Sequence, residues 1–267
     1  IHAHGKDIVR DMTFASDGTL WVATFTGLAR HNGRAFERII VGGDSLKDVM
    51  SMIPGADGSI RLGRRSGMAR CLFDGREAHM TTFALVPGEQ VSINQLITDG
   101  DHGFWEATST HGAIRFKEGE AGVTVSRITA SQGLGTNELM CAVRDQRGDL
   151  WFGTRGAGIA HHRGSAFMYY RSIKPISMAE DPQGTLWAGT AEGIARFDGQ
   201  RFHEQTEGFG EHGWTYSLSI DPQGRVGFGR NMADPLTHGI SWFDGRDYHV
   251  TNAPDDRTWS DIFWTMH

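Results

Sequence analysis

The stretch QGTLWAGTAEGIARFDGQRF, Gln183 to Phe202, decides the fold because the chain repeats it with variations. Five further copies align with it and begin at Asp17, Asp57, His102, Arg147 and Gln223. One column of the alignment holds tryptophan in most copies, and its six occupants are Trp21, Arg61, Trp105, Trp151, Trp187 and Gly227. Successive copies therefore lie 36 to 46 residues apart, a period typical of propeller blades or of helical arrays.

The local pattern of each copy distinguishes these two architectures. Every copy consists of short β-type runs between glycine turns, without an apolar helical period long enough for a helix. Pairs that favour the type I′ turns of β-hairpins recur at Asn32-Gly33, Asp74-Gly75, Asp198-Gly199 and Asp244-Gly245. The sequence therefore predicts an all-β fold, a β-propeller whose blades are four-stranded antiparallel sheets with strands A to D.

Six complete copies favour six blades within a single domain over residues 1–267. We expect the blades at residues 6–43, 46–84, 93–129, 137–171, 174–205 and 215–250. The tail at 259–267 reads as a closing strand, or as the first strand of a seventh blade if the chain is an excised part of a longer propeller.

The copies resemble the two-component-regulator propeller repeat, with the pattern D-x-x-G-x-L-W-x-G-T-x-x-G-[IL]-x-R-[FY], most closely at Asp145 to Ile159 and Asp181 to Phe197. This resemblance covers nearly the whole chain. It implies a periplasmic or extracellular ligand-sensing module, often attached to a histidine kinase, cyclase or DNA-binding output domain outside the chain. Some propellers of similar build are polysaccharide-active enzymes, so the resemblance leaves catalysis open.

Composition excludes several classes of function. The formal net charge of −6 gives no general attraction to nucleic acid. The two cysteines, Cys71 and Cys141, lie far apart without metal-ligand spacing, which favours buried free thiols. The chain has no run of eighteen apolar residues, and its N-terminus lacks the layout of a signal peptide, so we expect no membrane insertion by this segment.

Function is expected where the copies disagree near the predicted channel mouth. The last residue of strand B is Thr24, Thr108, Thr154 or Thr190 in four copies but Arg64 and Arg230 in the other two, which also lack the tryptophan. Arg65 and Arg155 add positive charge close by. Guanidinium groups bind carboxylates and phosphates, so these four arginines predict a site for a small anionic ligand, such as a uronate-containing or sulfated oligosaccharide. The alternative is that Arg64 and Arg230 pair with acidic neighbours such as Asp48 or Asp234.

Long loops on the same face are further candidates for ligand binding. The sixth copy carries an insertion from Asn231 to His238, and long connections run from Thr129 to Asn137 and from Gln205 to Tyr216. Trp214 and Tyr216 can stack on a sugar ring, or they can serve as packing between blades.

Thirteen histidines raise the question of a metal or of acid–base chemistry. The pairs His2 with His4 and His161 with His162 form no recognised metal motif, so we expect no metal and no cofactor. Candidates for proton transfer near the ligand face are Glu106, Glu138, His111, His212 and His238. Glu106 is unusual because other copies place Val22, Phe152 or Ala188 at its position.

The primary prediction is a sensor-type propeller that recognises a small anionic or saccharide ligand at the channel mouth. The alternative is a carbohydrate-active enzyme on the same arginine-lined face, a polysaccharide lyase before a glycoside hydrolase, in which a carboxylate or imidazole transfers a proton beside an arginine-bound uronate. The third is a protein-interaction scaffold, which needs no pocket.

Overall fold

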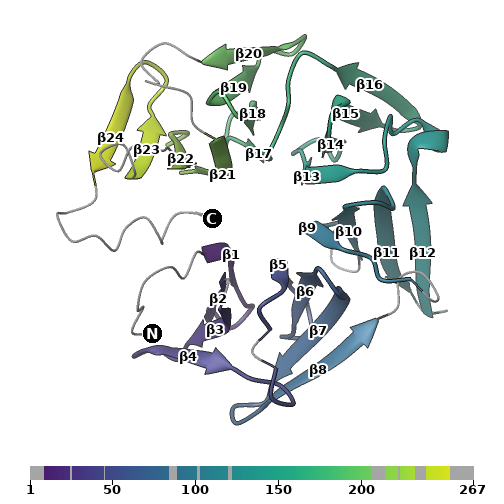
Figure 1. The fold of residues 1–267 in the computed structure, drawn as a ribbon, viewed down its shortest axis with the longest axis vertical. Helices are drawn as coiled ribbons and strands as arrows, with labels where there is room; N and C mark the ends of the chain where they lie inside the picture. Colours follow the sequence, from purple (N-terminus) through teal and green to yellow (C-terminus); the bar gives the residue numbers. More distant parts are fainter. Residues whose placement is uncertain are drawn as a thin grey trace. The chain divides into compact units, whose positions relative to one another are not determined.

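The computed structural model describes residues 9–24, 26–44, 46–83, 89–100, 103–119, 122–205, 214–221, 223–231 and 239–252. The described residues form six four-stranded antiparallel sheets, each connected in simple up-and-down order. The expected β-propeller of six four-stranded blades is thereby confirmed (Figure 1). The predicted closing strand at 259–267 and the histidines His2 and His4 lie outside the described residues.

The chain forms two compact units: residues 1–133 with 137–139, and residues 134–136 with 140–267. A single domain over the whole chain stays a prediction. The first unit contains three blades and one short 3₁₀ turn, η1. Their elements are β1 (Val9–Phe14), β2 (Leu20–Thr24), β3 (Gly27–His31), β4 (Phe36–Ile39), β5 (Val49–Pro54), β6 (Ile60–Arg64), β7 (Gly67–Phe73), β8 (Ala78–Phe83), β9 (Ile93–Thr98), β10 (Gly103–Thr108), β11 (Ala113–Gly119), β12 (Gly122–Ile128) and η1 (Ala130–Gln132).

The second unit contains the other three blades. Their strands are β13 (Leu139–Arg144), β14 (Leu150–Thr154), β15 (Gly158–Arg163), β16 (Ala166–Tyr170), β17 (Ser177–Glu180), β18 (Leu186–Gly189), β19 (Ile194–Phe197), β20 (Phe202–Gln205), β21 (Trp214–Ile220), β22 (Val226–Asn231), β23 (Gly239–Phe243) and β24 (Tyr248–Asn252). Within the described residues, no helix is long and apolar enough to cross a membrane.

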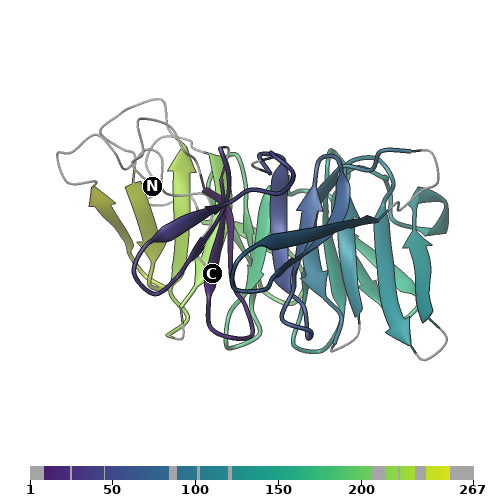
Figure 2. The same ribbon diagram turned by 90° about the horizontal axis from the view of Figure 1, so that it is seen from below.

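Neighbouring blades pack through their first two strands, A and B. In the first unit β5 lies against both β1 and β9, and Figure 2 shows the strands of these sheets running side by side between two loop-bearing ends. Trp21 and Ala23 of the first blade share a core with Met52 and Leu62 of the second. A blade is therefore stabilised mainly by the apolar face of its neighbour.

The turn from strand A to strand B explains the recurring Asp and Gly of the repeat. Asp145 accepts hydrogen bonds at Oδ1 from the backbone N–H groups of Arg147 and Asp149, at 3.0 and 2.9 Å, while Gly148 adopts a φ of 87°. Its Oδ2 accepts a bond of 3.0 Å from the indole Nε1 of Trp151. In the next blade Asp181 and Trp187 form the same bond at 3.0 Å. The repeat therefore encodes a turn that satisfies its own buried polar groups.

Cys71 and Cys141 are buried free thiols, as expected from the sequence. Burial raises the pKa of Cys71 to about 11 and that of Cys141 to about 12. Both side chains therefore stay neutral thiols within the apolar packing.

Candidate functional site

A threonine ends strand B in three blades and directly follows it in a fourth, and it has a structural role. Each hydroxyl donates to the carbonyl oxygen of the glycine that precedes or opens strand C and accepts a bond from a loop amide, so it closes the B-to-C loop. The donor and acceptor pairs are Thr24 with Gly27 at 3.1 Å, Thr108 with Gly112 at 2.7 Å, Thr154 with Gly158 at 2.6 Å, and Thr190 with Gly193 at 3.3 Å. The second blade has no threonine there and needs a different closure.

Arg64 ends β6 at this position and forms two ion pairs. Its Nε lies 2.8 Å from Oδ1 of Asp48, and its Nη2 lies 3.2 Å from Oδ2 of Asp44. The third guanidinium nitrogen, Nη1, points to the sulfur of Met80 at 3.6 Å. Only 10% of the Arg64 side chain is exposed. The ion pair with Asp48, one of the two alternatives that the sequence allows, is therefore present, and a ligand role for Arg64 stays a prediction.

Asp48 also fixes the loop that follows Arg64. Its Oδ2 accepts hydrogen bonds from the backbone N–H of Ser66, at 3.2 Å, and from the Ser66 hydroxyl. Its carbonyl oxygen accepts a bond of 3.0 Å from the backbone N–H of Arg65. Burial alone would raise the pKa of Asp48, but the bonds from Ser66 and Arg64 outweigh burial and hold this pKa below its usual value. Arg64 and Asp48 together replace the threonine closure.

Arg65 is left exposed at the tip of this loop. Within the described part of the chain its side chain forms no ion pair. Arg10, at the start of β1, lies close enough to Arg65 for their charges to interact. Burial lowers the pKa of Arg10, and the positive charge of Arg65 lowers it further, whereas the negative charge of Asp48 raises it. Arg10 itself donates to the carbonyl oxygens of Lys47 and Val49 at 3.4 Å. Two guanidinium groups thus share one end of the second blade.

The other predicted ligand residues belong to the second unit. Arg155 is exposed just after β14. Trp214 is 52% exposed and stacks on Tyr216, with ring centroids 5.6 Å apart and planes 29° apart. The backbone of Arg230 pairs with Thr215 and Gly239, and its side chain is not among the described parts of the structure. Their roles in binding stay predictions.

The candidates for proton transfer have different surroundings. Glu106 is fully buried in β10, and burial raises its pKa well above the usual value. Glu138 is exposed before β13. His111 lies in the B-to-C loop of the third blade, with Nε2 2.6 Å from Oε2 of Glu89 and Nδ1 2.7 Å from Oγ1 of Thr110. His212, His238 and the insertion at 232–238 lie outside the described residues. Catalytic roles for Glu106, Glu138, His111 and His238 stay predictions.

In the second blade Arg61 stands at the tryptophan position. Where the third to sixth blades place an aspartate, this blade has Gly55, and a Cβ atom there would lie 2.7 Å from Oδ1 of Asp57, 2.7 Å from Oγ of Ser59 and 3.1 Å from Nη1 of Arg61. Arg61 occupies the tryptophan position and lies over the ring of Phe104 at 5.0 Å. The second blade therefore has neither the aspartate nor the tryptophan, and Asp57, Ser59 and Arg61 occupy the space beside Gly55.

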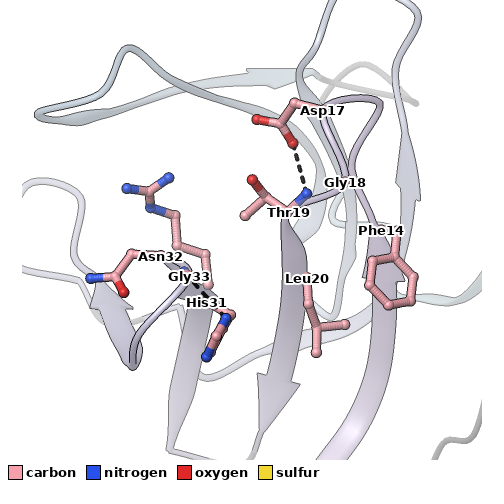
Figure 3. Close-up of a pocket in the computed structure, with 9 residues that line it drawn as sticks. Phe14, Asp17, Gly18, Thr19, Leu20, His31, Asn32 and Gly33 are labelled. Atoms are coloured by element: carbon pink, nitrogen blue, oxygen red, sulfur yellow. Dashed lines mark hydrogen bonds between the residues drawn. The ribbon is translucent and has the colours of Figure 1, made fainter.

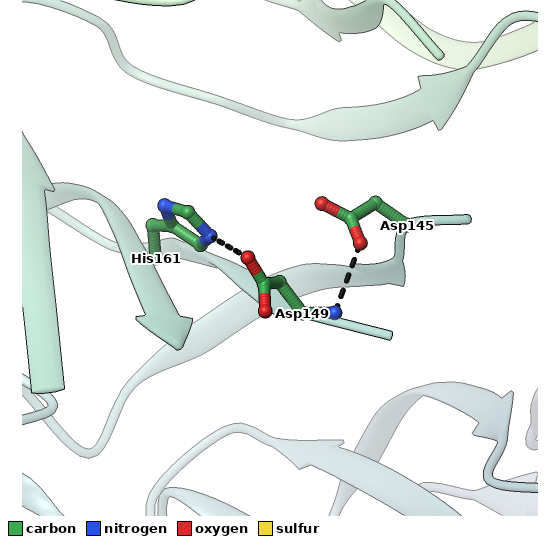
Figure 4. A group of neighbouring side chains, drawn as sticks. All are labelled: Asp145, Asp149 and His161. Atoms are coloured by element: carbon green, nitrogen blue, oxygen red, sulfur yellow. Dashed lines mark hydrogen bonds and ion pairs between the residues drawn. The ribbon is translucent and has the colours of Figure 1, made fainter. Parts of the chain in front are cut away.

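A cluster that sequence reasoning missed lies in the fourth blade, where Asp145, Asp149 and His161 place their ligand atoms within 4.8 Å of one another (Figure 4). His161 stacks on Trp151 with centroids 3.6 Å apart, and its Nε2 lies 3.0 Å from Oδ2 of Asp149. The signal in the sequence is a column in which four other blades have an arginine, at Arg30, Arg70, Arg115 and Arg196, and the sixth blade has Trp242.

The hydrogen bonds of this cluster do not favour a metal. Asp145 is already bonded to the Trp151 indole and to two backbone amides. A metal on Nε2 of His161 would place the remaining ring proton on Nδ1, which is buried without a hydrogen-bond partner among the described residues. When the ring proton is instead on Nε2 and is donated to Asp149, no N–H group of the ring is buried without an acceptor. The cluster is therefore better explained as a structural network.

A pocket of about 470 Å³ lies at the end of the first blade opposite its B-to-C loop, between the A-to-B and C-to-D turns (Figure 3). Its lining includes Phe14, Asp17, His31 and Asn32, and Asp17 accepts a bond of 2.8 Å from the N–H of Thr19. A second pocket of about 390 Å³ is lined by residues that include Arg38, Ile40, Phe73 and Arg76. Neither pocket includes an arginine that the sequence predicts to bind ligand.

Solved structures share this fold. The extracellular domain of the putative hybrid two-component system BT4673 from B. thetaiotaomicron superposes with a TM-score of 0.77 at 16% identity, over 99% of this chain and 36% of that chain. The corresponding domain of BT3049 from the same organism gives 0.71 at 16% identity, over 93% and 34%. Virginiamycin B lyase from Staphylococcus aureus gives 0.66 at 10% identity, over 95% and 87%.

The chain spans about a third of the length of the two extracellular domains. No protein-family model matches the chain, and no curated protein matches its sequence. At these identities the likeness concerns the fold alone. In its fold, the chain is therefore similar to the extracellular propeller domains of two-component-system proteins, which confirms the resemblance found in its repeats.

Proposed function

We propose that this chain is the ligand-sensing propeller of a signalling protein and that it binds a small anion at the B-to-C loop of the second blade. The observation that carries the proposal is the exposed Arg65 guanidinium, which has no acidic partner among the described residues and lies near Arg10. A carboxylate, sulfate or phosphate group bound between them would relieve their mutual repulsion.

The loop that presents Arg65 is held by several hydrogen bonds to Asp48. Asp48 holds the backbone on both sides of the tip, through the N–H groups of Arg65 and Ser66, and Arg64 neutralises Asp48. A preorganised loop loses little conformational entropy when a ligand binds. In this proposal Arg65 contacts the ligand, and Arg64 is a positioning residue.

The saccharide part of the proposal depends on the second unit. Trp214 is half exposed and stacks on Tyr216, which gives a flat apolar surface suited to the face of a sugar ring. An anionic saccharide such as an oligouronate would stack one of its rings on this surface. Arg155 and Arg230 remain candidates for its acidic groups.

The structural neighbours support the sensing role and its location. Two of them are extracellular domains of putative two-component systems. By analogy we propose a periplasmic or extracellular location and attachment to a signalling output domain.

Thermal denaturation with a panel of glucuronate, galacturonate and sulfated oligosaccharides tests the proposal. A ligand should raise the melting temperature of the wild type, and Arg65→Ala should abolish the shift without lowering the melting temperature of the free protein. Arg76→Ala is the matched control, because Arg76 is exposed on the C-to-D turn of the same blade and lies at its opposite end. A shift that survives in Arg65→Ala would contradict the proposed site.

A lyase remains the second candidate function because His111 and Glu89 form a partly exposed imidazole–carboxylate pair with a separation of 2.6 Å. Such a pair can remove a proton next to a uronate carboxylate. Incubation with polyuronates should then generate unsaturated products that absorb ultraviolet light, and His111→Ala should stop their formation. Unchanged product formation in His111→Ala would exclude this pair as the catalyst.

A further inference from the structure

Glu106 occupies a column that is apolar in every other blade. The residues at the same position of strand B are Val22, Leu62, Phe152, Ala188 and Phe228, and none of them is more than 6% exposed. Glu106 is 0% exposed. A carboxyl group thus replaces a hydrocarbon side chain at a fully buried position.

Its immediate neighbours are also apolar. Across the sheet Glu106 pairs with Leu96 of β9 and Ile114 of β11. On the same face of β10, two residues away, Phe104 packs with Ile53 and Met68 of the second blade. Glu106 therefore faces the junction between the second and third blades, which we call the 2–3 seam and which comprises Ile53, Met68, Val91, Ile93, Leu96, Phe104, Ile114 and Phe116.

The 2–3 seam is closely packed. Gly63 of β6 lies against β9, and a Cβ atom there would come within 2.8 Å of Cγ2 of Ile93 and 3.2 Å of Cγ of Leu96. One polar bond crosses the seam, from the N–H of Leu96 to Oγ of Ser51 at 3.1 Å. A tightly packed apolar seam has little capacity to solvate a charge.

The charged groups that face Glu106 across the seam are engaged elsewhere. Arg61 of β6 lies over the Phe104 ring, and Arg70 of β7 is ion-paired with Asp57. On β11, Arg115 pairs with Trp105 and so lies on the opposite face of the sheet. The strands β5 and β9 carry no charged side chain. Among the described residues, neither oxygen of Glu106 has a hydrogen-bond partner.

We propose that Glu106 is a proton-dependent switch in the 2–3 seam: its neutral carboxylic acid is tolerated in the closed seam, and loss of its proton favours opening between the second and third blades. The switch is independent of the anion site at Arg65. Its direction follows from the cost of a buried charge, which greatly exceeds that of a buried neutral carboxyl group.

The titration of Glu106 gives the sign of the effect. Because burial raises its pKa well above 4.5, the folded protein holds this proton at pH values where the unfolded chain has lost it. The contribution of Glu106 to stability is therefore greatest at low pH and falls as the pH rises from the unfolded pKa to the folded pKa. Above the folded pKa the loss is complete.

Two substitutions in the full chain test the switch. Glu106→Gln keeps the shape but cannot ionise, and Glu106→Leu introduces the residue that the second blade has at Leu62. Urea and thermal denaturation of both variants and of the wild type should be measured from pH 5 to pH 10. Glu204→Gln is the matched control, because Glu204 is an exposed glutamate within β20.

The expected result is a difference between variant and wild type that depends on pH. Both variants should melt at least about 3 °C above the wild type at the alkaline end, with a smaller gain for Glu106→Gln at pH 5. Glu204→Gln should follow the wild type throughout. A constant difference at all pH values would overturn the proposal. Failure of both variants to fold would also overturn it, because it would mean that Glu106 forms a required native bond.

Amide hydrogen exchange reports on the seam itself. In the wild type, protection of β9 and β10 should fall at alkaline pH more than protection of β14 and β15, after correction for intrinsic exchange. Glu106→Gln should restore it. An infrared band of a protonated carboxyl group that is present in the wild type at pH 5 and absent from Glu106→Gln would establish the neutral state directly. The absence of this difference at pH 5 would contradict it.

Discussion

Arg64 and Asp48 form an ion pair, 2.8 Å from Nε to Oδ1, at the position where four other blades use a threonine hydroxyl. The pair closes a loop whose tip carries Arg65. From the sequence, Arg64 and Arg65 are both candidates for ligand binding. In the structure Arg64 closes the loop through its ion pairs, and Arg65 is exposed to solvent.

Asp48→Asn should destabilise the protein by about 2 kcal/mol, because it leaves the largely buried Arg64 without its closest counter-charge and weakens the bonds to Ser66. Urea denaturation at neutral pH measures the loss. Asp44→Asn is the control, and its effect should be smaller because Asp44 is half exposed and its ion pair is longer. Equal losses would mean that the two carboxylates share the closure. Because the pKa of Asp48 is lowered in the folded state, its contribution is present near neutral pH and is lost as the pH falls through that pKa.

Thr154→Val should cost about 1–2 kcal/mol, since it leaves the Gly158 carbonyl oxygen and the Ala157 N–H without their buried partner. Thr154→Ser retains the hydroxyl and should lose much less. Thermal denaturation of the two variants gives the comparison. If the valine variant matches the serine variant, the hydroxyl does not stabilise the loop.

Trp151→Phe should lower the free energy of unfolding by about 2–3 kcal/mol. Oδ2 of the buried Asp145 loses the hydrogen bond from the indole N–H, and the smaller phenyl ring leaves a gap beside His161. Asp145→Asn tests the same bond from the other side. In a double-mutant cycle measured by urea denaturation, the double variant should be less destabilised than the sum of the two single variants. Additive losses would show that the two side chains are not coupled.

Added Zn²⁺ or Mn²⁺ should leave the melting temperature unchanged if the Asp145, Asp149 and His161 cluster is a structural network. Differential scanning calorimetry with and without a chelator checks this expectation. A rise with metal that disappears in His161→Gln would contradict the structural interpretation.

The Asp74 carboxylate should stay ionised in strongly acidic solution. Backbone N–H groups of Glu77 and Arg76, and then the His79 side chain, lower the pKa of Asp74 to about 2. The stability from this group is therefore present above its ordinary pKa and is lost as the pH falls towards 2. An NMR titration should show this pKa rising in His79→Ala, but not to its ordinary value, because the backbone bonds remain. Asp198, with its own His203, should be unaffected.

The blades could be predicted from the sequence because the hydrogen bonds of each turn join residues that are close together in the chain. Asp145 accepts a bond from Trp151 six residues later, and Asp198 accepts a bond from the N–H of Gln200 two residues later, so both bonds form within one turn. The tryptophan and threonine columns likewise marked strand B correctly.

The sequence could not predict how the departures from the repeat are accommodated. Asp48 was named as an acidic neighbour together with Asp234, but the second ion pair of Arg64, with Asp44 20 residues away, was not predicted. The alignment marked Glu106 as an unusual charge inside a strand, but its complete burial depends on the packing of two blades. The replacement of an arginine by His161 was visible in the alignment, but its stacking on Trp151 depends on three-dimensional packing.

Turns that form their hydrogen bonds within one blade affect how propeller chains can evolve. Since the A-to-B turns of the fourth and fifth blades satisfy their aspartate and their indole N–H within the same blade, such a blade can be duplicated, deleted or exchanged as a unit without leaving these two groups unsatisfied. Chimaeric chains assembled from these blades should tolerate recombination points in the D-to-A connections better than within a turn.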